Sequence, residues 1–430
     1  MRSQTIKRIE AFVLLIIAVL RPAPLNAAAA SLEAELSGAK AALLINTETG
    51  AVILERNSEE AVEVAGLKRL PALLTICRAF DSGRLKPDDE VTVSPEAAGM
   101  RGATAFLAPG EHIRAEELLK AAVILAPGDA ICALLQAICP SEAAALEAVN
   151  AELGNIRAGR LNGTAMGEGC SFTLSQLSKV CIELSKSEAF LRYSTVFLDT
   201  LRHESAADTE LANPNKLVRR YSGCFGLATG SVGSSDYSGA FIARRGATTF
   251  LALTAGLPDS ASRFKLASEM LDYGFSAYRA AVIFESGKSA GIVTVKGGAK
   301  ESVDVYPGGD VFALLPVADT RVFTEILLPG SVDAPIEKGD ALGSMQIKNA
   351  SGELLSEMPL YAEERVEASS FGLWFMRMIL GWLRVPDQSM SLGLTSTPLN
   401  PSVRTESASL QSAATAADVR FVLASFITTA

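Results

Sequence analysis

The folded part of the chain opens with two apolar stretches, AALLIN at residues 41–46 and AVILE at residues 51–55. A short polar segment that ends in glycine, TETG at residues 47–50, separates them. Two apolar stretches of strand length with such a connection predict a β-hairpin. We therefore expect the fold to begin with a pair of antiparallel strands.

Downstream of this hairpin the pattern changes from strand to helix and then back to strand. Residues 67–184 have helical character, with apolar side chains at three-and-four spacing that is clear in residues 116–124. Strand patterns return at residues 238–243 and 248–253, and residues 264–274 have the pattern of an amphipathic helix. Strands at both ends with helices between them predict an α+β domain built on one mainly antiparallel sheet.

The next part of the chain has the pattern of a second, smaller domain. Short apolar runs alternate with Gly, Pro and Asp turns over residues 280–366, which predicts a small all-β domain. The α+β domain accordingly spans residues 36–279. The chain has 430 residues and is long enough for both, since a domain averages roughly 150 residues.

The composition excludes several classes of function. The formal charge is −9, from 39 Lys and Arg against 48 Asp and Glu, and the cations form no basic block. A nucleic-acid surface needs clustered cations, so we expect no nucleic-acid partner. The two histidines, His112 and His203, are far apart in sequence, which disfavours a His-built metal site or a Ser-His-Asp triad. We expect neither a metal nor a cofactor.

The first 30 residues have the order of regions of a secretory signal peptide. A basic start at residues 2–8 precedes an apolar run at residues 11–20, and small residues follow at 27–30. An apolar run of this length is too short to span a bilayer as a helix. We interpret residues 1–30 as a cleaved export signal, with an uncleaved membrane anchor as the alternative.

The cysteines and several phenylalanines are expected in the interior of the protein. The six cysteines show no Cys-x-x-Cys spacing and lie in apolar stretches, so we interpret most of them as small buried side chains. Four phenylalanines are expected in the core rather than against a ligand, because aromatic side chains are usually buried. They are Phe106, Phe172, Phe225 and Phe241.

Residues 371–386, FGLWFMRMILGWLRVP, contain both tryptophans of the chain. At about 100° per residue, a helix of this sequence is apolar almost all round apart from one narrow polar stripe. It is short for a membrane span, so we expect an amphipathic helix in the membrane interface over residues 369–386, with a buried core helix as the alternative. Residues 387–430 are rich in Ser and Thr and poor in charge, and we expect them to be disordered.

Several short segments follow one another in a recognisable order between Ala41 and Pro386. They are AALLINTETG (41–50), EELLK (116–120) before GDA (128–130), NPNKL (213–217), GLATG (226–230), MLDYGF (270–275) and APIEKG (334–339). In order and spacing they resemble the low-molecular-mass penicillin-binding proteins, the serine D-alanyl-D-alanine carboxypeptidases that trim peptidoglycan stem peptides. The resemblance implies a transpeptidase domain of the penicillin-binding-protein and serine β-lactamase kind, an antiparallel sheet flanked by helices, followed by a small all-β domain.

The resemblance also implies where catalysis should occur. The family uses three motifs, S-x-x-K, S-x-N and K-T-G, and the first places a Ser nucleophile and a Lys base on one helix face. In VAGLKR, residues 64–69, Gly66 stands at the serine position and Arg69 at the lysine position. Glycine has no side chain to acylate, and a guanidinium stays protonated and cannot act as a base. Lys68 cannot replace it, since a side chain two residues from Gly66 points about 200° around the helix.

The second motif has lost both of its polar residues. The chain reads APG before Asp129, so Ala126 and Gly128 stand where S-x-N has its Ser and Asn. Two literal S-x-x-K strings occur elsewhere, at residues 37–40 before the first strand and at residues 262–265 in the closing helix. Neither lies where the groove is expected, so we assign neither to catalysis.

The third motif reads ATG, with Ala228 in place of the lysine that helps to bind the terminal carboxylate of the substrate. Thr229 and Gly230 keep the other two residues of this motif, and Lys216 lies in the segment that leads to it. We therefore expect Thr229, Gly230 and Lys216 to line a binding groove, and we expect no catalytic residue.

Three motifs that lose their chemistry while the scaffold pattern stays predict a pseudoenzyme. We expect an exported protein at the outer face of the cytoplasmic membrane or in the cell wall, attached to the membrane surface through Phe371 to Pro386. Its groove is expected to bind peptidoglycan stem peptides or another cell-wall enzyme. Two alternatives stay open: an active serine-type carboxypeptidase with a rearranged nucleophile, and a membrane-attached scaffold that acts through its β-domain.

Overall fold

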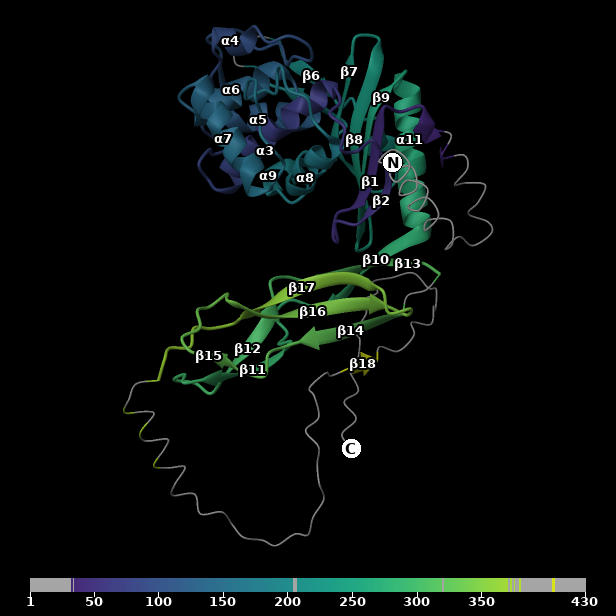
Figure 1. The fold of residues 1–430 in the computed structure, drawn as a ribbon. Coiled ribbons are helices and arrows are strands. Elements are labelled where there is room, and N and C mark those ends of the chain that lie inside the picture. The colour runs from purple at the N-terminus through teal and green to yellow at the C-terminus, as the bar shows by residue number, and fades with distance from the viewer. Residues whose placement is uncertain are drawn as a thin grey trace, which may run out of the picture. The chain divides into compact units, whose positions relative to one another are not determined.

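The computed structural model describes residues 32–369 except 34, 204–206 and 319–320, and also residues 372, 375, 379 and 404–406. The chain divides between Ala277 and Tyr278 into two compact units (Figure 1). This division lies beside the boundary between residues 279 and 280 that we expect from the sequence.

One five-stranded antiparallel sheet organises the first unit, in the order β2-β1-β9-β8-β7. Its strands are β1 (Ala41–Asn46), β2 (Val52–Arg56), β7 (Cys224–Val232), β8 (Ser235–Arg245) and β9 (Thr248–Leu257). β1 pairs with β2 in the expected hairpin and, along its other edge, with β9, so the start of the unit pairs with its end. The hairpin and the mainly antiparallel sheet predicted from the sequence are confirmed.

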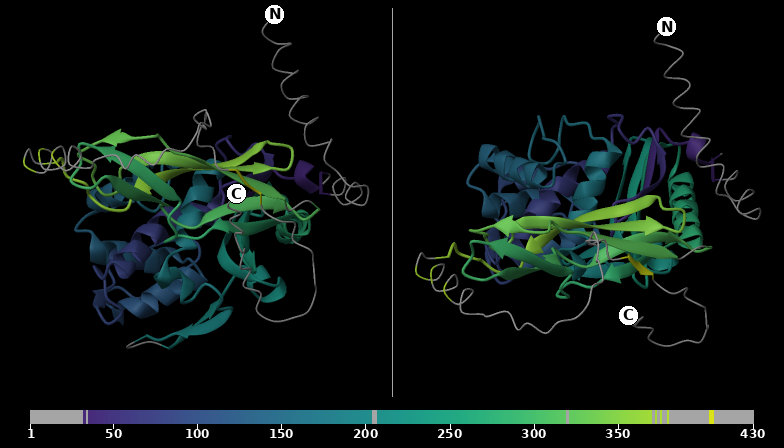
Figure 2. Two further views of the ribbon diagram at one scale, coloured as in Figure 1. Left: turned by 90° about the horizontal axis from the view of Figure 1, so that it is seen from below. Right: turned by 60° about the horizontal axis from the view of Figure 1, so that its bottom comes forward.

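Helices lie on both faces of this sheet (Figure 1). The helix α11 (Ser260–Ala277) runs along one face, and the helices that precede β7 gather on the other (Figure 2). The latter include α3 (Leu70–Asp81), α4 (Pro95–Ala98), α5 (Ala115–Ile124), α6 (Gly128–Ile138), α7 (Glu142–Asn155), α8 (Leu174–Leu184) and α9 (Glu188–Leu191). The α+β architecture expected for residues 36–279 is therefore confirmed.

Several short elements connect these layers. The 3₁₀ helix η1 (Ala65–Arg69) leads directly into α3, and α10 (Leu217–Arg220) precedes β7. Two small antiparallel pairs lie among the helices, namely β3 (Glu90–Thr92) with β4 (His112–Arg114), and β5 (Leu198–Leu201) with β6 (Thr209–Ala212).

The helix α3 is central to the helical group, because it contacts α6, α7, α8 and α9. Its side chains Leu70, Leu73, Leu74 and Ile76 are all at most 2% exposed. Nine of its twelve residues are buried, and the other three, Arg78, Phe80 and Asp81, lie in its last turn. Since η1 ends where α3 begins, the buried helix holds η1 in place.

The second unit is an all-β domain, as the sequence predicts. β10 (Tyr278–Phe284) pairs with β13 (Val311–Pro316), and the other strands form a sheet in the order β15-β11-β12-β17-β16-β14-β18. They are β11 (Gly291–Lys296), β12 (Ser302–Pro307), β14 (Val322–Leu327), β15 (Val332–Asp333), β16 (Ala341–Asn349), β17 (Leu354–Ala362) and β18 (Arg404–Glu406). Alternate valines of β11 and β12 enter its core, which follows the two-residue period of a strand.

Most residues at the two ends of the chain lie outside the described part of the structure. This applies to the expected signal at residues 1–30, and to most of the expected membrane helix at 369–386 and of the tail at 387–430. Within the tail, residues 404–406 form β18 against the edge of β14. No single helix in the described part is long and apolar enough to cross a membrane. Only α6 and α7 together reach that length and composition, and they are bent by 93°.

All six cysteines are free. Cys77, Cys139, Cys181 and Cys224 are buried, and the other two are partly buried, so their interpretation as small interior side chains is confirmed. Burial raises the pKa of the Cys77 and Cys181 thiols far above its ordinary value, and it raises the pKa of Cys224 to about 11. A thiol with a raised pKa forms little thiolate, which is the reactive form.

We expect the native protein to have six free thiols that react slowly with iodoacetamide, because most of them are buried and protonated. Intact mass spectrometry before and after reduction, followed by alkylation with and without guanidinium, tests this. Unfolding should expose all six to alkylation. A native mass that is lower by two hydrogens for each cysteine pair would contradict the prediction.

Candidate functional site

The first and third motif segments touch through their backbones. Gly66 lies in η1 and Gly230 in β7, and a Cβ on Gly230 would lie only 2.3 Å from the amide nitrogen of Gly66. It would also lie 3.0 Å from the Cα of Gly66. Contacts this short do not occur for a real Cβ, so the glycine at position 230 is required for η1 to lie against the strand. The structure thus brings Gly66, Thr229 and Gly230 together, as the sequence predicts.

The serine position of the first motif is occupied by a glycine that its backbone does not require. A Cβ added to Gly66 would lie 3.3 Å from the carbonyl oxygen of Thr229, a tight contact that a shift of a few tenths of an ångström relieves. The neighbouring residue Ala65, with φ of 47°, has the left-handed conformation instead. The backbone conformation at position 66 thus does not require glycine, and a small side chain there would need the Thr229 carbonyl to shift by a few tenths of an ångström.

Arg69 connects the first motif to the second. Its side chain lies among buried groups and is bonded at both terminal nitrogens: Nη1 donates to the carbonyl oxygen of Ala126 at 3.2 Å and Nη2 to that of Arg101 at 3.1 Å. Burial lowers the pKa of this guanidinium, and the nearby charges of Glu168 and Asp129 partly oppose that shift. A guanidinium keeps its proton even so and cannot serve as the base that S-x-x-K requires.

Arg69 also lies against the position of the second motif's amide side chain. A Cβ on Gly128 would lie 3.1 Å from Nη2 of Arg69, 3.3 Å from its Cζ and 3.2 Å from the Cβ of Met100. The long side chain at position 69 and the missing one at position 128 are complementary, since the guanidinium packs where a side chain at 128 would begin. The arginine at 69 and the glycine at 128 therefore depend on each other for their packing.

The two lysines nearest in sequence to the motifs have other contacts. Lys68 donates to Glu168 at 2.5 Å, so its ammonium group is engaged there, in agreement with its predicted direction away from the catalytic position. Lys216 is exposed, and its ammonium nitrogen lies 6.0 Å from the ring centre of Phe264 in α11. A role for Lys216 in the site stays a prediction.

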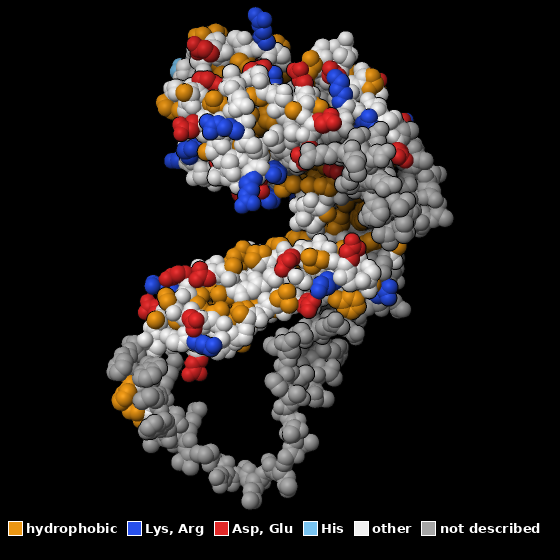
Figure 3. All heavy atoms as spheres, in the orientation of Figure 1, with side chains coloured by type: hydrophobic (Ala, Val, Ile, Leu, Met, Phe, Trp, Pro, Cys, Tyr) orange, Lys and Arg blue, Asp and Glu red, His pale blue; other side chains and the backbone are white. Residues whose placement is uncertain are grey.

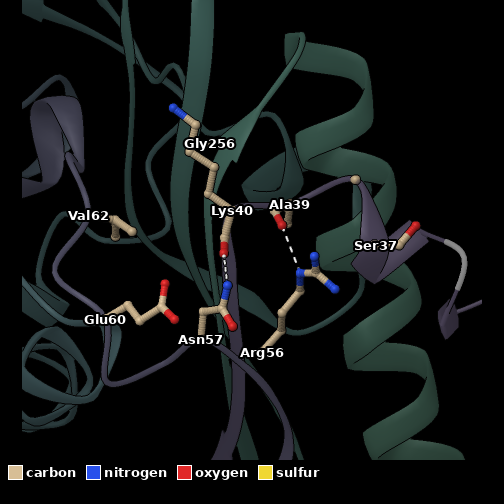
Figure 4. Close-up of a pocket in the computed structure, with 9 residues that line it drawn as sticks. Ser37, Ala39, Lys40, Arg56, Asn57, Glu60, Val62 and Gly256 are labelled. Atoms are coloured by element: carbon tan, nitrogen blue, oxygen red, sulfur yellow. Dashed lines mark hydrogen bonds between the residues drawn. The ribbon is translucent and has the colours of Figure 1, made fainter.

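Neither literal S-x-x-K string forms a catalytic pair. Ser37 and Lys40 line an open pocket of about 550 Å³, and Figure 4 shows the Lys40 ammonium group pointing away from Ser37. Lys40 instead pairs with Asp236 at 2.6 Å. In α11, Ser262 donates to Asp259 and Lys265 pairs with Glu35. In both strings the lysine is paired with an acid of another segment, and neither string lies in the motif segments.

The buried carboxylate of Asp129 holds the loop that precedes α5 against the start of α6. Asp129 is 1% exposed and accepts from the backbone amides of Ala105 at 2.8 Å and Leu107 at 3.4 Å, and from that of Ala130 at 2.8 Å. A carboxylate in the first turn of a helix is also favoured by the helix dipole. In the sequence Asp129 appears only within the GDA segment (128–130), and this anchoring role was not predicted. The position of Asp129 in the first turn of α6 is the feature of the sequence that could have indicated this role.

Phe106 corrects one expectation. Phe172, Phe225 and Phe241 are buried as expected, but Phe106 is 75% exposed. Its backbone has φ of 61°, and the amides of the residues on both sides donate to Asp129. This anchored, left-handed conformation turns the ring outward, which the apolar character of the residue alone does not predict.

The loop is also braced at its far end by a buried pair. Glu111 accepts from the backbone amide of Ala108 at 2.9 Å, and its other oxygen lies 2.7 Å from Nδ1 of His203. Nε2 of His203 lies 2.9 Å from the hydroxyl of Thr209 in β6. His203 therefore ties the loop to the β5–β6 pair and has no part in the three motif segments.

The strand of the third motif is fixed from behind by Arg263. This residue of α11 is 5% exposed, and its Nη1 donates to the carbonyl oxygens of Gly230 at 2.9 Å and Ser238 at 3.1 Å. Its guanidinium lies over the rings of Tyr237 and Phe264, at 5.5 and 4.7 Å from their centres. The geometry of β7 at the site thus depends on contacts that need none of the lost catalytic groups.

We expect Asp129→Ala to lower the free energy of unfolding by about 2–5 kcal/mol, because the buried amides of Ala105 and Leu107 lose their acceptor. Urea unfolding followed by circular dichroism measures this. Asp88, whose side chain is 87% exposed, is the matched control, and Asp88→Ala should cost less than about 1 kcal/mol. Equal effects of the two substitutions would contradict the anchoring role.

Comparison with known proteins gives two consecutive family matches. A family model described as D-alanyl-D-alanine carboxypeptidase matches residues 27–247. Another, described as penicillin-binding protein 5, C-terminal domain, matches residues 278–368. The two matches fall on the two units of the structure.

Individual relatives match over most of their length. The D-alanyl-D-alanine carboxypeptidase DacF of Bacillus subtilis is 29% identical over 352 residues, which cover 80% of this chain and 90% of that protein. DacC of Escherichia coli, also a D-alanyl-D-alanine carboxypeptidase, is 22% identical over 366 residues, 80% of this chain and 88% of the relative.

Solved structures show the same fold. Penicillin-binding protein 5 of Haemophilus influenzae superposes with a TM-score of 0.67 at 18% identity, over 77% of this chain and 98% of that one. A peptidoglycan synthesis regulatory factor of Streptococcus pneumoniae, PBP3, gives 0.58 at 18% identity, over 77% and 99%. Since the carboxypeptidase match alone spans half of the sequence, the chain belongs to the D-alanyl-D-alanine carboxypeptidase family, the low-molecular-mass penicillin-binding proteins.

Proposed function

We propose that this protein is a catalytically inactive member of its family that acts in cell-wall metabolism by binding. The ligand is a peptidoglycan stem peptide or another cell-wall enzyme. The observation that carries the proposal is Gly66 at the nucleophile position, beside an Arg69 whose guanidinium is bonded to the carbonyl oxygens of Ala126 and Arg101. Acyl transfer by this family needs an activated hydroxyl and a base, and both are replaced.

The three motif segments offer no substitute pair. Thr229 carries the one hydroxyl in residues 64–69, 126–130 and 228–230, and the one lysine of these segments, Lys68, is paired with Glu168. A threonine without a neighbouring base is a weak nucleophile. The backbone of η1 and β7 nevertheless keeps its close contact, so the shape of the site does not depend on the lost chemistry.

The proposal includes export and attachment to the outer face of the membrane. It is supported by the order of basic, apolar and small residues in 1–30, and by the two tryptophans in residues 371–386. Such a location would place the protein beside its proposed ligands.

We expect the purified protein to form no covalent adduct with a fluorescent penicillin, because no acylable side chain stands at position 66. Gel fluorescence and intact mass spectrometry, on a protein shown by circular dichroism to be folded, measure this. An adduct would contradict the proposal and favour the alternative of an active enzyme with a rearranged nucleophile, which peptide mapping would then identify.

The control for this experiment is a variant with the motifs restored. It combines Gly66→Ser, Arg69→Lys, Ala126→Ser, Gly128→Asn and Ala228→Lys. Arg69→Lys and Gly128→Asn must be made together, because a side chain at 128 would lie about 3.1 Å from the guanidinium. Acylation of this variant alone supports a dead site on a competent scaffold. Equal labelling of both proteins would refute it.

For membrane attachment, we expect Trp374→Glu with Trp382→Glu to move the protein from the membrane fraction to the soluble fraction of a lysate. Interfacial binding scales with buried apolar area, and charges on an apolar helix oppose it. Ser389→Glu with Ser391→Glu adds the same charge just beyond the segment and should leave the protein on the membrane. Release by the serine variant as well would show that charge alone, and not this helix, determines the result.

A further inference from the structure

The fold brings together two Arg-Arg pairs that are separate in the sequence. Arg219 and Arg220 end α10, and Arg244 and Arg245 end β8. The amide of Arg244 donates to the carbonyl oxygen of Gly223 at 2.9 Å, so the end of β8 lies against the segment that follows α10. All four arginines are exposed. We call these four residues the arginine belt.

Aromatic rings lie beneath three of the four guanidinium groups. The distances to the ring centres are 5.6 Å for Arg219 over Phe197, 5.2 Å for Arg244 over Phe225, and 4.9 and 4.4 Å for Arg245 over Tyr221 and Phe275. A ring attracts the cation through its face, whereas the N–H groups of a guanidinium lie in its own plane. These contacts therefore position the cations without neutralising their charge.

Carboxylates neutralise only part of this charge. Asp272 lies 3.6 Å from Arg245. Glu48 is connected to Arg244 only through Thr249, whose amide donates to Glu48 and whose hydroxyl accepts from Nε of Arg244. Within the described part of the chain, the other three members of the belt form no ion pair shorter than 4.0 Å. Although the whole chain is acidic, the belt therefore has an excess of positive charge.

The four cations surround the end of the sheet and do not converge on one point. Consecutive residues of a strand point to opposite faces of a sheet, so Arg244 and Arg245 lie on opposite faces. Arg245 accordingly contacts Phe275 of α11, whereas Arg244 contacts Phe225 of β7. A single small anion cannot reach cations on both faces, but a long anion with repeated charges can.

We infer that the arginine belt binds an extended polymer of phosphodiesters outside the cell membrane. A guanidinium pairs with phosphate oxygens through two parallel hydrogen bonds. Each exposed contact is weak, but several contacts along one polymer reinforce one another because only the first is bimolecular. The inference rests on the proposed export of the protein and does not involve the groove of the three motifs.

A phospholipid headgroup carries the same phosphodiester, but the belt fits a bilayer surface less well. Surfaces that bind the membrane interface combine cations with exposed apolar side chains that insert between the lipids. Tyr221 and Phe275 are only partly exposed and Phe225 is buried, so the rings beneath Arg244 and Arg245 are not free to insert. We therefore assign the belt to a polymer.

The probe is a fluorescently labelled poly(glycerol phosphate), and its binding to the unmodified full-length protein is measured by fluorescence anisotropy. We expect the affinity to fall at least about tenfold when the salt concentration rises from about 50 to about 200 mM, because binding to a polyanion releases its counterions. This measurement needs no variant and is independent of any effect of mutation on folding. Absence of binding at low salt, or binding that salt does not weaken, would overturn the inference.

Two variants of equal charge locate the binding. The belt variant replaces its four arginines by Gln and should bind the polymer at least about tenfold more weakly. The control variant removes four other exposed arginines that have no ion pair in the described part of the chain, and it should bind within about twofold of the unmodified protein. These are Arg84, Arg157, Arg160 and Arg202. Equal losses in the two variants would overturn the inference.

A single substitution covers the case in which the belt variant does not fold. The side chain of Arg220 forms no hydrogen bond, ion pair or ring contact among the described residues, so its loss removes charge without removing a structural contact. We expect Arg220→Gln to weaken polymer binding by about threefold to fivefold and to leave the thermal unfolding temperature unchanged. Unchanged binding would contradict a role for the belt.

Vesicles that contain phosphatidylglycerol distinguish the polymer from the membrane. The unmodified protein and the belt variant should bind these vesicles equally, since membrane attachment is proposed for residues 371–386. Weaker vesicle binding by the belt variant would assign the belt to lipid headgroups and overturn the polymer as its ligand. Failure of polymer binding would leave the proposed function of the groove intact, because the belt and the three motif segments share no residue.

Discussion

The close contact between the backbones of η1 and β7 is the constraint on which the site depends. A Cβ at Gly230 would lie 2.3 Å from the amide nitrogen of Gly66, so only glycine at 230 allows the two segments to meet. The contact is held from two sides, by the buried helix α3 that continues from η1 and by Arg263, which bonds to the carbonyl oxygen of Gly230. None of these interactions involves a catalytic side chain. The arrangement therefore does not require a serine at 66 or a lysine at 69.

The replacements in the first two motifs form one rearrangement. An arginine at 69 needs more room than a lysine, and Gly128 provides it, since a side chain there would begin 3.1 Å from Nη2. In return the guanidinium bonds to the carbonyl oxygen of Ala126, in the same segment. A single reversion is therefore expected to disturb the packing without restoring chemistry, because each partner is adapted to the other.

Polar anchors outside the motifs explain how the scaffold keeps its shape. Asp129 and Glu111 hold the loop that carries Phe106, and both carboxylates are buried. Their acceptor oxygens satisfy backbone amides that no other described group satisfies, so their loss would leave buried donors unpaired. Such groups are constrained by folding and not by catalysis. An aromatic side chain held outward by this loop is a consequence of the same anchors.

Much of the architecture could be predicted from the sequence because local patterns determine it. The apolar stretches at residues 41–46 and 51–55 with a Gly-containing turn specify a hairpin, and two-residue periodicity specifies the β-domain. Gly66 and Arg69 offer neither an acylable hydroxyl nor a base, since the properties of these residue types do not depend on the fold. Only the tertiary structure decides that Arg69 lies over Gly128, that Asp129 turns Phe106 outward, and that Arg263 supports Gly230. These pairs are distant in sequence, and their burial and partners depend on packing between elements, about which one-dimensional periodicity carries no information.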